Sequence, residues 1–217
     1  MNDHPALERI KALPIFAGLT APSADSALKA AEAAIAGGLT QISILLSTPG
    51  AYRVISDLRR AHGDAMLVGA GAVVTSEMAD RAIKAGAQFL LSPHTDDEIL
   101  SMCRDRGLLG IAGALTPSEV MRAWNLGCPI VSVHPAGPFG GPSYVHMMAE
   151  SFEEVRLMPS GGVSFENMRD HFRAGAYAVV IGAGLFSTAD VQTGNFTRIT
   201  ERARALVATY SESLVES

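Results

Sequence analysis

Lysine is scarce in this sequence, and the positive charge that is present is scattered. Lys11, Lys29 and Lys84 are the only lysines among 217 residues, and the formal net charge is −5 with a pI near 5.7. Proteins that bind nucleic acids or anionic membranes carry basic clusters, and this sequence has none. We therefore expect no nucleic acid and no membrane among the partners, and a small molecule as the ligand.

Cysteine and long apolar runs are also lacking. Cys103 falls in a helical pattern and Cys128 precedes an expected strand, and neither has a metal-ligand spacing. We interpret them as reduced, buried thiols and not as a disulfide scaffold. The first residues lack the basic segment and apolar run of a secretory signal, and no run of about 18 apolar residues could span a membrane. These absences predict a cytoplasmic protein.

What the sequence does contain is a regular alternation of short apolar runs and helical patterns. Eight runs predict strands over 13–17, 40–46, 65–70, 89–92, 108–112, 129–134, 155–159 and 178–182. The segments between and after them predict helices over 23–36, 49–62, 75–85, 96–106, 117–126, 141–149, 165–174 and 193–214. Eight βα units predict a (β/α)₈ TIM barrel in a single domain, residues 1–217, with a short helix over 4–12 closing one end. A doubly wound open sheet is the competing architecture, but it rarely needs eight such regular units.

Two helix starts carry their own signals. Thr116-Pro117-Ser118-Glu119 has the Thr-x-x-Glu spacing of a capping box, with proline at the first helical position. The segment Thr95-Asp96-Asp97-Glu98 has the same spacing. Both predict a helix that begins directly after the threonine.

Glycines follow the seventh and eighth predicted strands. Ser160-Gly161-Gly162 ends the seventh strand, and Gly182-Ala183-Gly184 ends the eighth. Barrels frequently hold a phosphate between these two loops, where backbone N–H groups and a helix N-terminus bind an anion without lysine or arginine. The pattern predicts a phosphate site, to which Gly140-Gly141 could add further N–H donors. The alternative is that turns need glycine for conformational reasons alone.

Four segments together resemble one known family. They are GGLTQISILLSTP, VGAGAVVTSEMADRAIKAGAQFLLSP, HPAGPFGGPSY and VRLMPSGGVSFENMRDHFRAGAYAVVIGAGLF. In order, spacing and glycine positions they resemble the 2-keto-3-deoxy-6-phosphogluconate (KDPG) aldolases, also called 4-hydroxy-2-oxoglutarate aldolases. The resemblance implies a barrel, a homotrimer, and cleavage of small 2-oxo acids to pyruvate and an aldehyde through a lysine Schiff base.

The residues that carry the chemistry of that family differ here. Against the family pattern, the Schiff-base lysine falls on Ser132, the general acid/base on Ser43 and the substrate-binding arginine on Ser47. A Schiff base requires an amine, because only nitrogen forms the iminium that accepts electrons. All three lysines lie in helical segments, so the sequence predicts a divergent member without this chemistry. A lysine from a neighbouring subunit is the remaining alternative, and it would need a long reach.

Strand alternation predicts what takes the place of the lost groups. If the sixth strand keeps the orientation that the family resemblance implies, Ser132 and His134 point inward while Val131 and Val133 face the helices. The second strand then has the same parity, with Ser43, Leu45 and Ser47 inward and Ile42 and Ile44 outward. We expect Ser43, Ser47, Ser132 and Pro135 to line the pocket, with His134 and His94 at its rim as candidate general acids or bases. The alternative is that the serines fill space and the histidines bond to backbone carbonyls.

Two further arrangements are disfavoured. A metal site built from His94, His134 and His146 lacks an inward carboxylate, so we expect no metal and no other cofactor. A direct Ser132–His134 nucleophilic pair is also poor, since residues two apart on a strand are roughly 6.6 Å apart along it.

Two functions remain open. One is an enzyme that binds a small phosphorylated oxo acid or sugar phosphate and performs lyase-type or proton-transfer chemistry with His134, joined by His94. The other is a catalytically degenerate aldolase homologue that binds a phosphorylated metabolite or acts in an assembly. Fold alone does not distinguish them.

The missing amine generates a first prediction. Incubation with pyruvate followed by sodium borohydride should leave the chain unmodified, because borohydride reduces an iminium and a serine cannot form one. Intact-protein mass spectrometry measures the outcome, and a lysine-dependent member of the family is the positive control. A stable adduct on any lysine, from the same subunit or its neighbour, would overturn the interpretation.

Overall fold

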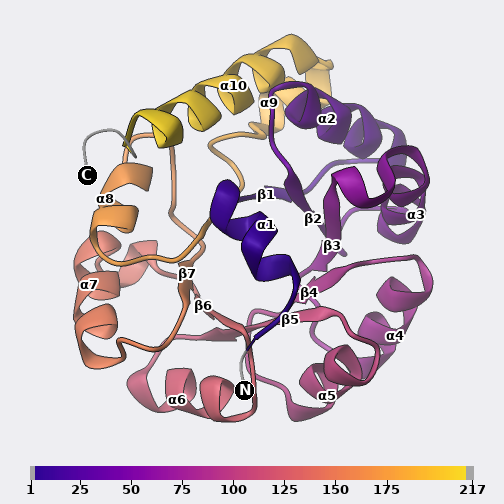
Figure 1. Ribbon diagram of the computed structural model, residues 1–217. Coiled ribbons are helices and arrows are strands. Elements are labelled where there is room, and N and C mark those ends of the chain that lie inside the picture. The colour runs from indigo at the N-terminus through magenta and orange to yellow at the C-terminus, as the bar shows by residue number, and fades with distance from the viewer. Residues whose placement is uncertain (1–2, 214–217) are drawn as a thin grey trace.

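Eight parallel strands curl around a central axis in the computed structural model, which describes residues 3–213 (Figure 1). Along the sheet they follow the order β7-β6-β5-β4-β3-β2-β1-β8. The strands are β1 (Ile15–Leu19), β2 (Gln41–Leu45), β3 (Leu67–Gly71), β4 (Phe89–Leu91), β5 (Leu109–Ala114), β6 (Ile130–Val133), β7 (Leu157–Pro159) and β8 (Val179–Ile181). Each overlaps one of the eight predicted runs.

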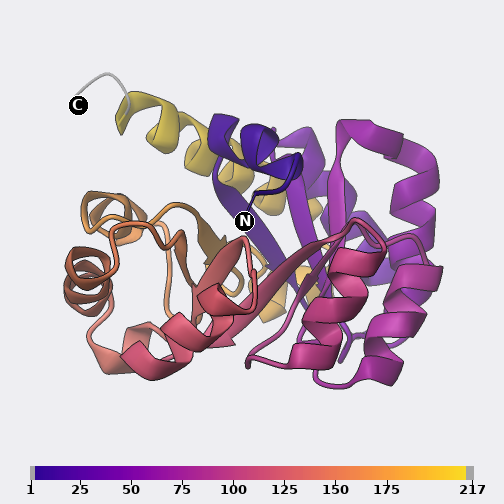
Figure 2. The same ribbon diagram turned by 60° about the horizontal axis from the view of Figure 1, so that its bottom comes forward.

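The barrel is nearly closed between the two end strands. A backbone hydrogen bond of 2.8 Å from Tyr177 N–H to Leu157 O links the start of β8 to β7. Helices surround the outside of the sheet (Figures 1 and 2). The TIM-barrel prediction is therefore confirmed, and the open-sheet alternative is wrong.

The helices alternate with the strands. They are α1 (Ala6–Ala12), α2 (Ala24–Ala36), α3 (Ala51–His62), α4 (Ser76–Lys84), α5 (Asp97–Asp105), α6 (Pro117–Asn125), α7 (Pro142–Ser151), α8 (Met168–Arg173), α9 (Thr188–Thr193) and α10 (Phe196–Ser213). Two 3₁₀ turns, η1 (Gly63–Ala65) and η2 (Gly137–Phe139), and the short α9 were not predicted. Residues 1–2 and 214–217 of the predicted domain, with the last residue of the helix predicted over 193–214, lie outside the described residues.

One of the two predicted helix caps is confirmed and the other is wrong. At α6 the Thr116 side chain accepts from the Glu119 backbone, and the Glu119 carboxylate accepts from Thr116 N–H at 2.8 Å. At α5 the cap is Asp96, whose carboxylate accepts from Ile99 N–H at 2.9 Å. Thr95 instead donates its hydroxyl to the Gly113 carbonyl of β5 at 3.0 Å, because a tertiary acceptor lies within its reach.

The segment after β7 stays non-helical longer than predicted. Its helix begins at Met168 and not at 165. Asn167 holds the preceding loop: its amide oxygen accepts from Ser164 N–H at 2.8 Å, and its amide nitrogen donates to Gly162 O at 2.9 Å. A side chain that satisfies backbone groups locally competes with the helix, which explains the later start.

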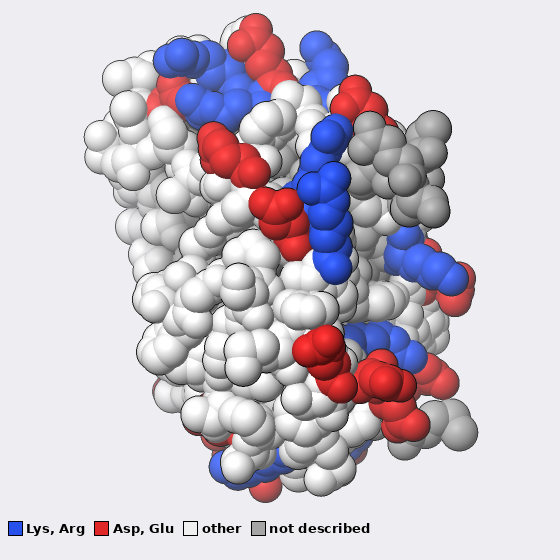
Figure 3. Space-filling model, turned by 90° about the vertical axis from the view of Figure 1, so that its left-hand side faces the viewer, with Lys and Arg blue, Asp and Glu red and all other residues white. Residues whose placement is uncertain are grey.

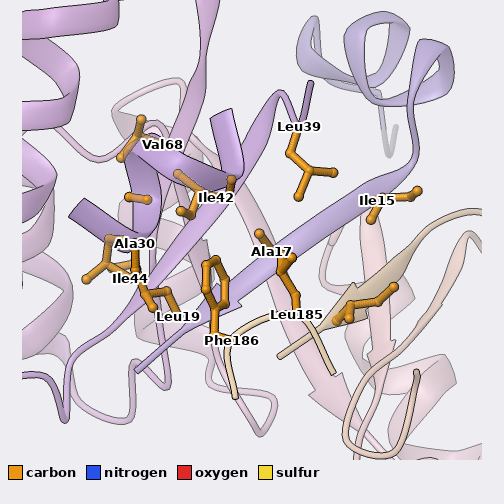
Figure 4. Packing of buried hydrophobic residues seen from close by; sticks show 14 of the residues in the cluster. Ile15, Ala17, Leu19, Ala30, Leu39, Ile42, Ile44, Val68, Leu185 and Phe186 are labelled. Carbon is orange, nitrogen blue, oxygen red and sulfur yellow. The ribbon is translucent and has the colours of Figure 1, made fainter. Parts of the chain in front are cut away.

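The main apolar core lies between the sheet and the surrounding helices. Ile42 and Ile44 of β2 face this layer together with Val68 of β3 and Ala30 of α2 (Figure 4). Alternate residues of one strand point to opposite faces, so the inward positions of β2 are Gln41, Ser43 and Leu45. The predicted orientation of β2 is confirmed.

A second core fills the inside of the barrel at its amino-terminal end. Phe16 and Phe89 meet edge to face there, with ring centroids 5.2 Å apart. Helix α1 lies across this end and inserts Ile10, which is fully buried (Figure 1). The predicted closing helix is confirmed, and it leaves only the opposite end of the barrel accessible to a ligand.

Charged side chains form small groups of mixed sign on the face that carries α7 and α8 (Figure 3). Arg169 pairs with Glu212 at 2.8 Å, and Arg173 pairs with Asp170 at 3.3 Å. A large part of this face carries no charge (Figure 3). Within residues 3–213, no helix is long and apolar enough to cross a membrane.

The plug formed by α1 generates a stability prediction. Ile10→Ala should lower the free energy of unfolding by about 2–5 kcal/mol, because it leaves a cavity under the barrel floor. Urea denaturation measures the loss. Lys11→Ala on the exposed side of the same helix is the matched control and should change stability by less than about 0.5 kcal/mol. Equal stability of the two variants would show that α1 does not plug the barrel.

Candidate active site

The carboxyl ends of the strands surround a cavity of about 550 Å³ at the end of the barrel opposite α1. Its floor and one side include Gly18 of β1, Leu45 of β2 and Ala72 after β3. The other sides are formed by Ser92 and Pro93 after β4, Ser132 and His134 from β6, residues 160–164 after β7 and residues 182–184 after β8. The volume is within the range of small-molecule sites.

The sixth strand places its serine and histidine as predicted. Val131 and Val133 pack in an outer apolar cluster, so Ser132 and the following His134 face the interior. Ser132 is 1% exposed, whereas His134 is half-buried. The peptide bond between His134 and Pro135 is cis.

Ser160 connects these two side chains. Its hydroxyl lies 2.9 Å from Ser132 Oγ and 2.9 Å from His134 Nδ1. The direct Ser132–His134 pair is replaced by a three-membered chain of hydrogen bonds. Ser160 was predicted as a phosphate ligand. In the structure the residue is 6% exposed, and its hydroxyl takes part in this chain of hydrogen bonds.

His134 is the one titratable side chain among the described residues that line the cavity. Burial lowers its pKa below the ordinary value, and the backbone of Ser160 offsets part of this effect. Since the ordinary histidine pKa is about 6.5, the imidazole is neutral at pH 7. A neutral imidazole can donate from one nitrogen and accept at the other.

The loop after β7 depends on glycine for two reasons. Gly161 and Gly162 have φ of +71° and +107°, which disfavours side chains. A Cβ on Gly162 would also lie 2.6 Å from Gly137 Cα, and one on Gly161 would lie 3.2 Å from His134 Nδ1. The glycines therefore allow the loops after β6 and β7 to touch, with Gly137 N–H donating to Gly161 O at 2.8 Å.

Backbone N–H groups of both glycine loops remain available. Those of Gly161, Gly162, Ala183 and Gly184 donate no hydrogen bond to another described residue. All four residues line the cavity. Unpaired N–H groups at a cavity wall are suited to an anionic ligand.

Several predicted pocket residues lie outside the cavity wall. Ser43 points inward but is fully buried, and its Oγ has no hydrogen-bond partner within residues 3–213. Ser47 is exposed beyond the end of β2. Pro135, Gly140 and Gly141 also do not contribute to the lining. These placements follow from where each strand ends, which inward parity alone does not specify.

His94 does not line the cavity either. Its side chain is 46% exposed, and its Nδ1 lies 3.1 Å from Ser92 Oγ. Ser92, which is 3% exposed, lines the cavity in its place. His94 was predicted at the rim of the pocket because an imidazole can act as a general acid or base. Phe89 faces the inner core, so strict alternation would turn Ser92 outward. Ser92 nevertheless reaches the cavity wall because β4 ends at Leu91 and the chain turns there.

The lysines and cysteines lie away from this cavity and do not form a second catalytic or metal site. Lys11, Lys29 and Lys84 are exposed on α1, α2 and α4, and Lys84 pairs with Asp80 at 2.6 Å. Cys103 and Cys128 are buried, as predicted, and burial raises the pKa of their thiols to about 12 and about 11. Within the described chain, no group of three His, Cys, Asp or Glu residues is placed to hold a metal ion.

Fold and site together define a TIM-barrel protein with a small-molecule cavity at the carboxyl end of its strands. More specifically, the chain belongs to the family described as KDPG and KHG aldolase, which it matches over residues 7–202. The 2-dehydro-3-deoxy-phosphogluconate aldolase of Treponema pallidum is 29% identical over 195 residues, which cover 90% of this chain and 91% of the relative.

Solved structures agree with this assignment. The KDPG aldolase of Legionella pneumophila has a TM-score of 0.83 at 27% identity, covering 89% of this chain and 94% of that one. The 2-keto-3-deoxy-6-phosphogluconate aldolase of Zymomonas mobilis ZM4 has a TM-score of 0.82 at 26% identity, covering 95% and 97%. The family resemblance noted in the sequence is confirmed.

The environment of His134 generates a titration prediction. Its pKa, followed by NMR of the imidazole signals, should lie below about 6.5. Because the folded pKa is depressed, the stability from this group is present above about pH 6.5 and is lost as the pH falls through the folded pKa. Comparing urea denaturation of the wild type and His134→Ala across pH 7.5 to 5 measures this. A pKa above the ordinary value would contradict the burial described here.

Proposed function

We propose that this barrel binds a small phosphorylated oxo acid or sugar phosphate and performs proton-transfer or lyase-type chemistry through His134, without a lysine Schiff base. The observation that carries the proposal is the cavity wall itself, where His134 is the one titratable side chain among the described residues. Histidine is the side chain best suited to accept and donate protons near physiological pH.

The proposal that Schiff-base chemistry is absent rests on the positions of the lysine amino groups. The Legionella pneumophila structure holds pyruvate captured as a covalent carbinolamine. Against the family pattern the position of the Schiff-base lysine falls on Ser132 of β6, and the three lysines lie exposed on α1, α2 and α4. Because a hydroxyl cannot form an iminium, we propose that this chain forms no such adduct.

The phosphate part of the proposal rests on the glycine loops. Gly161, Gly162, Ala183 and Gly184 line the cavity, and their N–H groups donate no hydrogen bond to another residue of the described chain. The Zymomonas mobilis structure contains 3-phosphoglycerate, which shows that a relative accepts a phosphorylated three-carbon acid. The homotrimer implied by the family resemblance and the cytoplasmic location expected from the sequence belong to this proposal as well.

A second candidate function is binding without turnover. The observation that favours it is the absence of a carboxylate from the described residues of the wall. General acid–base chemistry commonly uses two groups of different pKa, and here only His134 is present. A degenerate aldolase that binds a phosphorylated metabolite, alone or in an assembly, would need nothing more.

Binding is tested with a charge placed among the N–H groups. Ala183→Asp should weaken binding of glycerol 3-phosphate or ribose 5-phosphate at least about tenfold, because the carboxylate repels the phosphate at close range. Thermal shift against ligand concentration measures the affinity. Ala189→Asp on the exposed side of α9 is the matched control and should bind as the wild type does. If both variants bind the ligand equally well, the phosphate does not bind at these loops.

Turnover distinguishes the two functions. Any phosphorylated oxo acid or sugar phosphate that binds should be converted by the wild type, and His134→Ala should lose about 10²–10⁴-fold in kcat while still binding, since general acid–base groups contribute that much. NMR of the reaction mixture follows substrate and product. His146→Ala, on the exposed side of α7, is the control. Binding with no conversion across the panel would establish the second function instead.

A further inference from the structure

The hydrogen-bond chain in the cavity has a direction that follows from its buried end. Ser132 is 1% exposed, and among the described residues the only partner of its hydroxyl is Ser160 Oγ. A buried hydroxyl hydrogen without an acceptor is unfavourable, because the group has lost its hydrogen bonds to water. The Ser132 hydrogen is therefore directed at Ser160 Oγ, which accepts it.

This direction decides what Ser160 donates. A hydroxyl has one hydrogen, and Ser160 Oγ has two partners, both at 2.9 Å. Since Ser160 accepts from Ser132, its own hydrogen is free for His134 Nδ1. The opposite direction, with Nδ1–H donating to Ser160 and Ser160 donating to Ser132, would leave the buried Ser132 hydrogen without an acceptor.

The tautomer of the histidine follows. A neutral imidazole that accepts at Nδ1 carries its hydrogen on Nε2. His134 Nε2 has no hydrogen-bond partner in the described chain and is not among its buried unpartnered atoms. Gly161 packs against the Nδ1 and Cε1 edge of the ring, which leaves the Nε2 edge free for a ligand in the cavity.

We infer that His134 presents Nε2–H to the ligand as a hydrogen-bond donor that polarises a carbonyl oxygen, with Ser160 and Ser132 as the residues that set its tautomer. This inference rests on the proposed function and makes it more specific, because it requires a phosphorylated ligand with a ketone or aldehyde group. A fixed donor aimed at the oxygen on which charge develops stabilises that charge. Neutral imidazole acts in this way in other barrel enzymes.

The inference assigns different roles to the three residues. His134 would touch the ligand, whereas Ser160 and Ser132 act through it as positioning residues. The arrangement also shows why the serine at the position of the family lysine retains a function: its hydroxyl starts the chain that orients Ser160. Ser164 lines the same cavity but takes no part in the chain, so it serves as a control.

The tautomer is tested without any ligand. In ¹⁵N NMR of the whole protein at pH 7.5, His134 Nδ1 should resonate as an unprotonated nitrogen and Nε2 as a protonated one. Ser160→Ala should shift the population towards the Nδ1–H form, Ser132→Ala should shift it less, and Ser164→Ala should leave it unchanged. A protonated Nδ1 in the wild type would overturn the inference, whatever the protein binds.

The carbonyl contact is tested with dihydroxyacetone phosphate as the probe. Infrared difference spectra should show the carbonyl stretch of the bound ketone at lower frequency than in solution for the wild type and for Ser151→Ala, a control on the exposed side of α7. His134→Ala should lose this shift, and Ser160→Ala should reduce it. A bound ketone with an unshifted carbonyl would overturn the inference but leave the proposed function standing. If ketone and aldehyde phosphates fail to bind at all, the proposed function fails, and the carbonyl contact with it.

Discussion

Parallel pairing of β6 between β5 and β7 is the constraint on which the site depends. Ser132 pairs with Gly113 on one side and with Met158 on the other. Because side chains alternate between the two faces of a strand, a slip of one residue would turn Val131 and Val133 into the barrel and move the serine and histidine to the helices. Packing of Val131 and Val133 against the helices therefore fixes the register of β6, and this register determines which polar side chains face the cavity.

The same pairing explains how three side chains from two strands meet. β7 ends at Pro159, so Ser160 leaves the ladder at the level of His134, and its N–H donates to Val133 O at 3.0 Å. Contact between the backbones of Gly137 and Gly162 then brings the two following loops together. A side chain at either glycine would separate the loops, so these glycines support the Ser160 hydrogen bonds as well as leaving N–H groups available.

The alternation of short apolar runs and helical patterns predicted the eightfold barrel, because these periodicities are local in the sequence. The inward direction of Ser132 and His134 was predicted from strand alternation together with the strand orientation that the family resemblance implies. Strand alternation did not predict the bridge through Ser160, which depends on the stagger of two strands separated by more than twenty residues. The exposed position of His94 was missed for a related reason: the chain turns away after β4, and Ser92 takes the cavity wall. Tertiary acceptors also overrode a local cap signal at Thr95, whose hydroxyl found the Gly113 carbonyl.

The two sides of the cavity act on His134 in opposite directions. Burial lowers its pKa, whereas an anion held by the glycine loops would favour the protonated ring through the Coulomb interaction. Protonation adds a hydrogen at Nδ1, and Ser160 would then accept where it had donated. The hydrogen on Nε2 is present in the neutral and in the protonated ring. His134 therefore presents a donor to the ligand whether burial or the bound anion has the larger effect on its pKa. A carbonyl oxygen can therefore be bound over a wide pH range by a single histidine, and what protonation changes is only how strongly that oxygen is polarised.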